Sequence, residues 1–379
     1  MINSFEELNI NKNIIEGLKK DNILIPTKIQ TEVIPKALLN KDIIGRSATG
    51  SGKTLAYLIP IFQKIDKERE TQAIILAPTH ELVMQIERDI KLLAANSNSY
   101  ITALSIIGDV NIKKQIEKLK MKPNIVVGSA NRVYDLIKLK KLKAHTVKTI
   151  VIDEGDRLLD VNNISKIKDV IKTTLRDRQL MLFSATVNSK TIESAKGLMK
   201  KPELIIIDDN TVLNSNISHF YITVERRDKV DALRKLIAAV EPTKSIAFIN
   251  KVGEIEIATA KLQFHKVKAY AMYGKASKEE RQSALESFRM GKIDLLVSSD
   301  LSARGLHIED ISHIFNLDLP EDPNEYLHRV GRTGRANKTG TAISIVTKSE
   351  VHILKTYEKK LKIKIEERNL YKGKLVEPF

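Results

Sequence analysis

Residues 42–60 read DIIGRSATGSGKTLAYLIP, which places a glycine-rich loop between a short apolar run and a helical pattern. Gly50 and Gly52 allow the backbone to turn its amide groups inward, and the amino-terminal end of the following helix favours an anion. Lys53 supplies a cation for β- and γ-phosphates, and the Thr54 hydroxyl is a ligand for Mg²⁺. Strand, loop, Gly-Lys-Thr and helix together predict a nucleotide-binding site rather than a structural turn.

A second stretch that indicates phosphate chemistry is VIDEGD at residues 151–156, where an apolar run is followed at once by carboxylates. An ordinary strand end that turns into a solvated loop is the plain alternative. Adjacent carboxylates repel each other, so a balancing positive charge is expected nearby. Asp153, 100 residues after Lys53 and at the end of an expected strand, is placed to hold Mg²⁺ through water, as the Walker-B acid does. Glu154 would then orient and deprotonate the water that attacks the γ-phosphate.

Length and charge restrict the class of protein. A chain of 379 residues exceeds one compact core and suits two domains of ordinary size. The 63 basic and 47 acidic residues leave a formal charge of +16, which favours nucleic acid as a partner before a membrane. The absence of cysteine excludes disulfides, thiolate metal sites and cysteine nucleophiles. We expect a cytoplasmic protein, because neither a signal peptide nor an apolar run of roughly 20 residues is present.

Short apolar runs separated by stretches of helical spacing organise the chain. Such β-branched, nearly continuous runs are typical of parallel strands that helices cover on both faces. The polar stretch 208–216 lacks periodicity and is interpreted as a linker. We therefore predict an α/β protein with tandem domains at 1–207 and 217–379, each a mostly parallel sheet flanked by helices. Residues 357–379 are expected to form one helix and a short basic tail. The expected strands are 73–78, 101–107, 124–129, 149–154, 180–186, 203–208, 219–225, 245–250, 267–273, 294–300, 313–319 and 341–347.

Together these motifs resemble those of the DEAD-box ATP-dependent RNA helicases, in the family's order and over almost the whole chain. DEGD at 153–156 stands in the place of DEAD, and SAT at 184–186 resembles the motif that couples hydrolysis to domain closure. The other matching segments are IPTKIQ (25–30, Q motif), SATGSGKT (47–54, motif I), APTHELV (77–83, motif Ia), GSANR (128–132, TPGR-type motif), SIAFIN (245–250, motif IV), SSDLSARGLH (298–307, motif V) and HRVGRTGR (328–335, motif VI).

The resemblance implies two RecA-like P-loop domains that bind and hydrolyse ATP with Mg²⁺. Gln30 would read the adenine edge, and Arg332 and Arg335 would act as arginine fingers if the domains close on ATP. His328 would hydrogen-bond across the cleft toward the SAT segment. The expected catalytic residues are Lys53, Asp153, Glu154, Ser184, Thr186, His328, Arg332 and Arg335. The expected nucleotide-binding residues are Gln30, Ser47, Ala48, Thr49, Gly50, Ser51, Gly52, Lys53, Thr54, Asp153, Arg332 and Arg335, with Thr54 and Asp153 as metal ligands.

RNA is the partner that the resemblance implies. Short side chains and helix amino termini would hold the phosphate–ribose backbone rather than base edges, which makes binding independent of sequence. Contacts to 2′-hydroxyl groups would favour RNA over DNA. A monomer without membrane attachment is expected. The expected RNA-binding residues are Thr79, Glu81, Gly108, Arg132, Arg281 and Arg304.

Departures from the family pattern lie mostly at the RNA track, the adenine and the ribose. They are Ile23 in place of an aromatic residue, His80 for arginine, Asp109 for glycine, Ala130 and Asn131 for Pro-Gly, Gly155 for alanine, Lys278 for glutamine and His307 for aspartate. The groups nearest the transferred phosphate are retained, so hydrolysis is expected to survive. Two alternatives stay open: an ATP-binding RNA clamp or assembly factor with weak hydrolysis, and a P-loop enzyme that acts on DNA.

Overall fold

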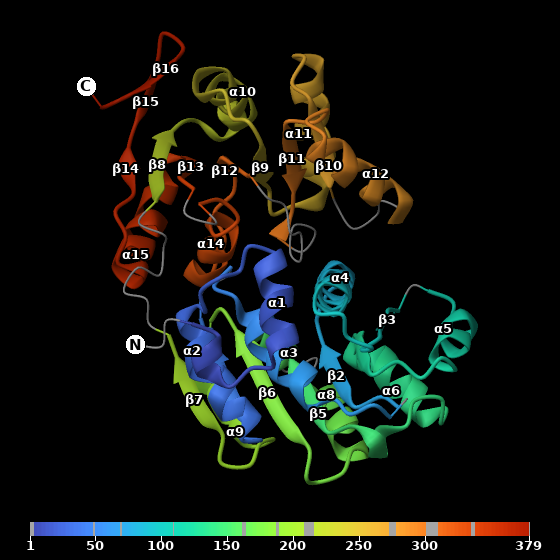
Figure 1. Ribbon diagram of the computed structural model, residues 1–379. Helices are drawn as coiled ribbons and strands as arrows, with labels where there is room; N and C mark the ends of the chain where they lie inside the picture. The colour runs from blue at the N-terminus through green and yellow to red at the C-terminus, as the bar shows by residue number, and fades with distance from the viewer. Residues whose placement is uncertain are drawn as a thin grey trace. The chain divides into compact units, whose positions relative to one another are not determined.

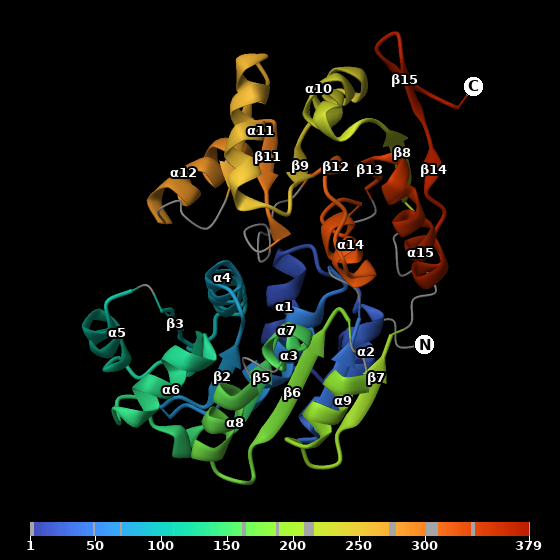
Figure 2. The same ribbon diagram turned by 180° about the vertical axis from the view of Figure 1, so that it is seen from behind.

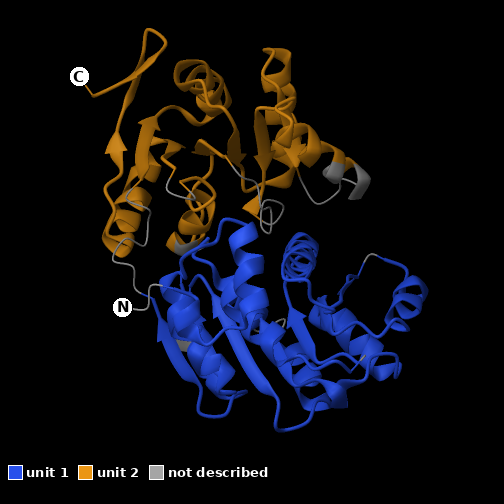
Figure 3. Ribbon diagram, viewed as in Figure 1, with its two compact units in different colours: residues 1–209 blue, residues 210–379 orange. Residues whose placement is uncertain are grey.

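The computed structural model describes residues 4–47, 50–68, 70–108, 110–160, 164–186, 189–207, 216–272, 278–300, 310–334 and 338–378. It divides into two compact units, residues 1–209 and 210–379, which Figure 3 distinguishes by colour. No helix among the described residues is long and apolar enough to cross a bilayer. Several residues named above lie outside the described ones: Ala48, Thr49, Asp109, Arg304, His307 and Arg335.

Unit 1 is built on a parallel sheet with the strand order β3-β4-β2-β5-β6-β1-β7. Every pairing in it is parallel, as the continuous apolar runs predicted. The strands are β1 (Ile43–Arg46), β2 (Ala73–Leu76), β3 (Ala103–Ile106), β4 (Ile125–Gly128), β5 (Thr149–Ile152), β6 (Gln179–Ser184) and β7 (Glu203–Ile206).

Helices cover both faces of this sheet (Figures 1 and 2). Ile43 and Val151 face one group of helices, whereas Ile44 and Ile152 face the other, because successive side chains of a strand point to opposite faces. The first group comprises α1 (Lys12–Lys20), α2 (Lys28–Leu38), α3 (Lys53–Lys64) and α4 (His80–Asn96). The second comprises α5 (Ile112–Leu119), α6 (Ala130–Lys138), α7 (Gly155–Leu158), α8 (Ile164–Thr173) and α9 (Ser189–Lys196).

Unit 2 repeats the topology of unit 1. Its parallel sheet has the order β10-β11-β9-β12-β13-β8-β14, which is the order of unit 1 with each strand number raised by seven. The predicted α/β class, with two parallel sheets flanked by helices, is thereby confirmed. The strands are β8 (Ile217–Thr223), β9 (Ser245–Phe248), β10 (Ala269–Met272), β11 (Leu295–Ser298), β12 (His313–Asn316), β13 (Gly340–Val346) and β14 (Glu366–Glu367). Helices α10 (Lys229–Val240) and α11 (Val252–Phe264) cover one face, and α12 (Lys278–Arg289), α14 (Pro323–Val330) and α15 (Val351–Leu361) cover the other.

The carboxy-terminal segment differs from the predicted helix and tail. After α15 the chain adds β14 beside β8 and then forms an antiparallel pair, β15 (Asn369–Tyr371) with β16 (Lys374–Val376). Leu370 and Leu375 of this pair pack against the core beneath α10. Ile363 and Ile365 alternate with lysines, a period of two that the basic composition conceals when the sequence is read alone.

His219 on β8 gives the stability of unit 2 a pH dependence. Its Nδ1 lies 2.9 Å from the Tyr326 hydroxyl, and its buried Nε2 has no partner among the described residues. Burial lowers the pKa of His219 from 6.5 to about 4. Because the unfolded state then binds the proton more readily, stability is lost as the pH falls from 6.5 toward 4.

We expect the free energy of unfolding to fall by about 2 kcal/mol between pH 7 and pH 5 on account of this one imidazole. Replacing it in His219→Phe should remove that part of the pH dependence. Urea unfolding followed by circular dichroism measures the change, with the exposed His352→Phe as the matched control. Equal pH dependence in wild type and His219→Phe would show that the buried imidazole is not the cause.

Candidate functional site

The strand order of unit 1 brings the predicted phosphate-binding segments to one edge of the sheet. The loop that leads to Lys53 follows β1, Asp153 follows β5, and Ser184 ends β6. These strands are neighbours in the order β5-β6-β1, and they are parallel. Because the carboxyl ends of parallel strands meet at one edge, residues distant in the sequence are gathered there.

The loop before α3 has the backbone that a phosphate cradle requires. Gly50 and Gly52 have φ of 80° and 93°, in the left-handed region that favours glycine. Lys53 Nζ donates to the carbonyl oxygen of Ser47 at 2.7 Å, and the Ser47 and Ser51 hydroxyls are hydrogen-bonded to each other. The Lys53 ammonium group therefore binds the backbone of the loop that precedes it.

Gln30 connects α2 to this loop. Its Oε1 accepts from the Thr27 backbone N–H at 2.9 Å, which completes a capping box, and its Nε2 donates to the Gly52 carbonyl at 3.1 Å. The Gln30 side chain is buried, and a Cβ on residue 52 would lie only 2.5 Å from its Nε2. The close approach is a second reason for glycine at residue 52. Recognition of adenine by Gln30 stays a prediction.

Asp153 is a buried carboxylate with fixed partners. Its Oδ2 accepts from the Tyr57 hydroxyl at 2.9 Å, and its Oδ1 accepts from the Glu154 backbone N–H at 2.9 Å. Burial and the neighbouring Glu154 raise the pKa of Asp153 to about 6, while Lys53 and Tyr57 act in the opposite direction. Lys53 is thus part of the positive balance that the adjacent carboxylates were expected to need.

Tyr57 belongs to the candidate site but was not predicted from the sequence. Besides donating to Asp153, its hydroxyl lies close to the Thr54 side chain, so it adjoins both predicted metal ligands. The spacing contained a signal, because Tyr57 lies one helical turn after Lys53 and therefore on the same side of α3. Its polar atom had no visible partner in the sequence, since Asp153 lies 96 residues away.

Asp156, the last letter of DEGD, links this segment to SAT. Its carboxylate accepts from the Thr186 hydroxyl, and its backbone N–H donates to Ser184 Oγ at 3.4 Å. Ser184 Oγ in turn donates to the Thr186 carbonyl at 2.7 Å. Glu154 lies beside them with a left-handed backbone, φ 50°, and pairs with Arg157 at 3.3 Å. The two motifs are thus joined within unit 1.

The strands on the other half of the same edge carry predicted RNA contacts. Thr79 follows β2, Gly108 follows β3, and Arg132 lies on α6 after β4, in the strand order β3-β4-β2. Thr79 caps α4, with Glu81 in its first turn, and Arg132 donates to the carbonyls of Gly108 and Val110. The sheet order therefore places the predicted RNA contacts after β3, β4 and β2, next to the predicted nucleotide contacts after β5, β6 and β1. Arg281 lies on α12 of unit 2, and its side chain is outside the described atoms.

In unit 2, Arg329 lies in the last turn of α14, next to His328 in the sequence and three residues before Arg332, and it is almost fully buried. Its guanidinium donates to both carboxylate oxygens of Asp300, at 2.6 and 2.5 Å, and to Asn250 Oδ1 at 2.7 Å. It also donates to the Asp318 carbonyl. No role for this arginine was predicted from the sequence, although Asn250 ends the segment that matches motif IV and Asp300 lies in the one that matches motif V.

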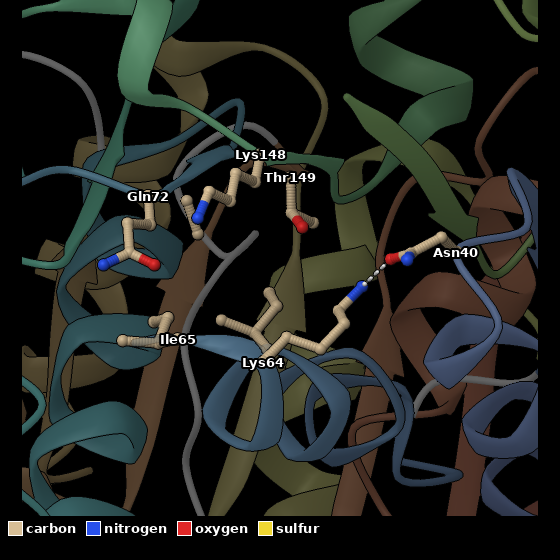
Figure 4. A pocket seen from close by; sticks show the side chains of 8 residues that line it. Asn40, Lys64, Ile65, Gln72, Lys148 and Thr149 are labelled. Carbon is tan, nitrogen blue, oxygen red and sulfur yellow. Dashed lines mark hydrogen bonds between the residues drawn. The ribbon is translucent and has the colours of Figure 1, made fainter. Parts of the chain in front are cut away.

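A cavity of about 250 Å³ lies at the opposite edge of the unit 1 sheet (Figure 4). Ala73 and Thr149 begin β2 and β5, so the cavity is at the amino-terminal ends of the strands, away from the Lys53 loop. Lys64 Nζ donates to Asn40 Oδ1 at 3.1 Å there, and burial lowers the pKa of Lys64 to about 8. This cavity is separate from the candidate nucleotide site.

Unit 1 has a glycine-rich phosphate loop, and both units have the same parallel strand order. The protein is therefore of the P-loop class, with two α/β units. Residues 27–195 match the family model of DEAD/DEAH box helicases, and residues 228–337 match that of the helicase conserved C-terminal domain. The chain is 42% identical to the DEAD-box ATP-dependent RNA helicase CshC of Bacillus cereus, over 93% of this chain and 90% of that protein. It is also 42% identical to the probable ATP-dependent RNA helicase YfmL of Bacillus subtilis, over 92% of each.

Two solved structures show the same likeness. Dbp5 of S. cerevisiae bound to RNA and ADP BeF3 has a TM-score of 0.88 at 29% identity, covering 96% of this chain and 95% of that one. Mss116p bound to ssRNA and AMP-PNP has a TM-score of 0.85 at 26% identity, covering 96% and 78%. The chain belongs to the family of DEAD-box ATP-dependent RNA helicases, and DEGD stands where that family is named for DEAD.

Gly155 lies against Leu182 of β6, which explains this departure. A Cβ on residue 155 would be 2.6 Å from Leu182 Cγ and 2.8 Å from both of its methyl carbons. Leu182 is fully buried, so its side chain has no open space to move into. Glycine at this position is therefore required by its neighbour.

We expect Gly155→Ala to lower the ATP hydrolysis rate about tenfold or more, because an overpacking cost of about 1–3 kcal/mol falls on the segment that holds Glu154. Leu182→Ala removes every atom that clashes, so the double variant should regain most of the rate. Turnover at saturating RNA measures this, with Leu182→Ala alone as the control. A double variant no faster than Gly155→Ala would contradict the steric explanation.

Proposed function

We propose that this chain couples Mg-ATP hydrolysis to RNA binding and to local unwinding or remodelling of RNA duplexes or RNA–protein complexes. The observation that carries the proposal is the strand order of unit 1, which sets the predicted nucleotide and RNA groups beside each other on one sheet edge. The printed names of the relatives and the RNA-bound structural neighbours support the same activity.

The triphosphate would lie on the loop before α3, with Lys53 released from the Ser47 carbonyl to contact its phosphates. Asp153 and Thr54 suit Mg²⁺, because one is a buried carboxylate, the other a hydroxyl, and Tyr57 contacts both. When bound, Mg²⁺ would neutralise charge on the β- and γ-phosphates. Gln30, Gly50, Ser51 and Gly52 would complete this side of the site.

Glu154 would act as the general base that orients the attacking water. Its left-handed backbone and the Arg157 pair fix its carboxylate at the end of β5. From unit 2, Arg332 and Arg335 would supply guanidinium groups that stabilise charge on the transferred phosphate. His328 would contact the SAT segment, which the Asp156–Thr186 bond already ties to Glu154's loop.

RNA would be held through its backbone by residues that follow β2, β3 and β4, with unit 2 contributing Arg281 and Arg304. The net charge of +16 supports attraction to a polyanion. One chain contains the complete set of motifs, so a monomer would suffice for the reaction. A cytoplasmic location is part of the same proposal.

The test is steady-state ATP hydrolysis with and without single-stranded RNA, repeated over a series of salt concentrations. We expect RNA to stimulate turnover and the stimulation to weaken as salt rises, because phosphate contacts release counterions. DNA of the same sequence is the control. ATP-dependent RNA binding with no stimulated turnover would favour an RNA clamp instead, and equal stimulation by DNA would overturn the choice of RNA.

A further inference from the structure

Helix α11 of unit 2 has a second apolar face that its own unit does not cover. Ile255, Ala258 and Leu262 point into the core and are buried. On the opposite side, Ile257 is 58% exposed and Phe264 is 84% exposed. Apolar residues thus lie on two opposite faces of this helix, whereas a surface helix of a globular protein ordinarily has a polar outer face.

The exposed apolar residues form one stripe. Gly253, Ile257, Ala260 and Phe264 are spaced by four, three and four residues, and each is exposed. The same spacing separates the a and d positions, which form the contact between two paired helices in a parallel or antiparallel coiled coil. Within the stripe, small residues alternate with large ones.

We propose that α11 pairs with α11 of a second copy of this chain, antiparallel and about a twofold axis. In that arrangement Ile257 lies opposite Ala260 of the second copy, and Phe264 lies opposite Gly253. Each layer then joins a large side chain to a small one, as close packing requires. Parallel pairing would instead set Phe264 against Phe264 and leave a gap at Gly253.

The charges beside the stripe fit the same pairing. Glu254 and Lys261 lie seven residues apart on one flank of the stripe, and both are exposed. A twofold axis perpendicular to antiparallel helices brings like flanks together, so Glu254 meets Lys261 of the second copy, twice per dimer. Glu254 also pairs with Lys251, the residue just before its helix, at 3.5 Å, while 48% of the Glu254 side chain stays exposed.

A second copy is therefore the occupant that the residues themselves specify. Two copies of this one helix match each small residue of the stripe with a large one and each Glu254 with a Lys261, so no other partner is needed. This inference goes beyond the proposed function, because none of its residues belongs to the nucleotide or RNA groups.

Sedimentation equilibrium of the full chain over a range of concentrations tests the proposal. We expect a reversible monomer–dimer equilibrium for wild type, a monomer for Ile257→Glu, and wild-type behaviour for Leu39→Glu, a matched change at an exposed leucine of unit 1. Glu254→Lys and Lys261→Glu should each weaken the dimer, and their combination should restore it. A wild type that stays monomeric at the highest attainable concentration overturns the proposal.

Cysteine cross-linking tests the orientation, since the chain has no cysteine of its own. When Ile257→Cys and Ala260→Cys chains are mixed and oxidised, antiparallel pairing should cross-link the two different variants in preference to like ones. Cross-links mainly between like variants would overturn the antiparallel arrangement. ATP hydrolysis by Ile257→Glu should equal that of wild type, which separates failure of this inference from failure of the proposed function.

Discussion

Glu154→Gln is expected to lower RNA-stimulated ATP hydrolysis by about 10²–10⁴-fold, the usual contribution of a positioned general base. The amide matches the carboxylate in size, so the α7 backbone and the contacts of Asp153 should persist. Because the phosphate loop lies on a different strand end, affinity for ATP should change little. The rate falls because an amide cannot accept the proton of the attacking water.

Turnover and nucleotide affinity need separate measurements for this variant. Fluorescent-nucleotide titration gives affinity, and phosphate release at saturating RNA gives the rate. Glu117→Gln on α5, an exposed residue that pairs with Lys120, is a matched control that should leave both unchanged. A Glu154→Gln chain that hydrolyses ATP at the wild-type rate would remove Glu154 from the role proposed for it.

Arg329→Ala is expected to lower the free energy of unfolding of unit 2 by about 3–5 kcal/mol. The substitution would leave the Asp300 carboxylate without its bidentate partner and would orphan Asn250 Oδ1 and the Asp318 carbonyl. Those acceptors follow β11, β9 and β12, so the loss would loosen three neighbouring strand ends together. The stacking of Arg329 on Phe248, 4.9 Å from the ring centroid, would be lost as well.

Arg329→Lys should recover little of this stability, because one ammonium group cannot reproduce the planar fork that contacts both Asp300 oxygens. Urea unfolding followed by circular dichroism measures the effect. Arg227→Ala is the matched control. The Arg227 side chain is 87% exposed, and its ion pair with Asp228 has a long separation of 4.0 Å. A loss below about 1 kcal/mol, as for an exposed ion pair, would contradict the role assigned to Arg329.

The sequence alone determined the class of fold and indicated the segments of the candidate nucleotide site. Continuous β-branched runs and helical spacing are local patterns, so parallel strands such as β5 and β6 could be predicted without knowing their neighbours. The Gly-Lys-Thr loop is equally local, because one segment supplies its glycines, its cation and its helix. The short strand β14 escaped prediction, since the alternation of Ile363 and Ile365 just before it is masked by lysines and the strand itself consists of two glutamates.

Only the tertiary structure decided which polar atoms meet. Tyr57 and Asp153 are 96 residues apart, and Arg329 and Asn250 are 79 apart. Gly155 at the start of α7 is explained by Leu182 on β6. These contacts depend on strand order, which places the carboxyl ends of β5, β6 and β1 together, and no local periodicity records that order. A sequence motif predicts the local structure and chemistry of one segment, whereas the strand order of the sheet decides which distant residues contact that segment.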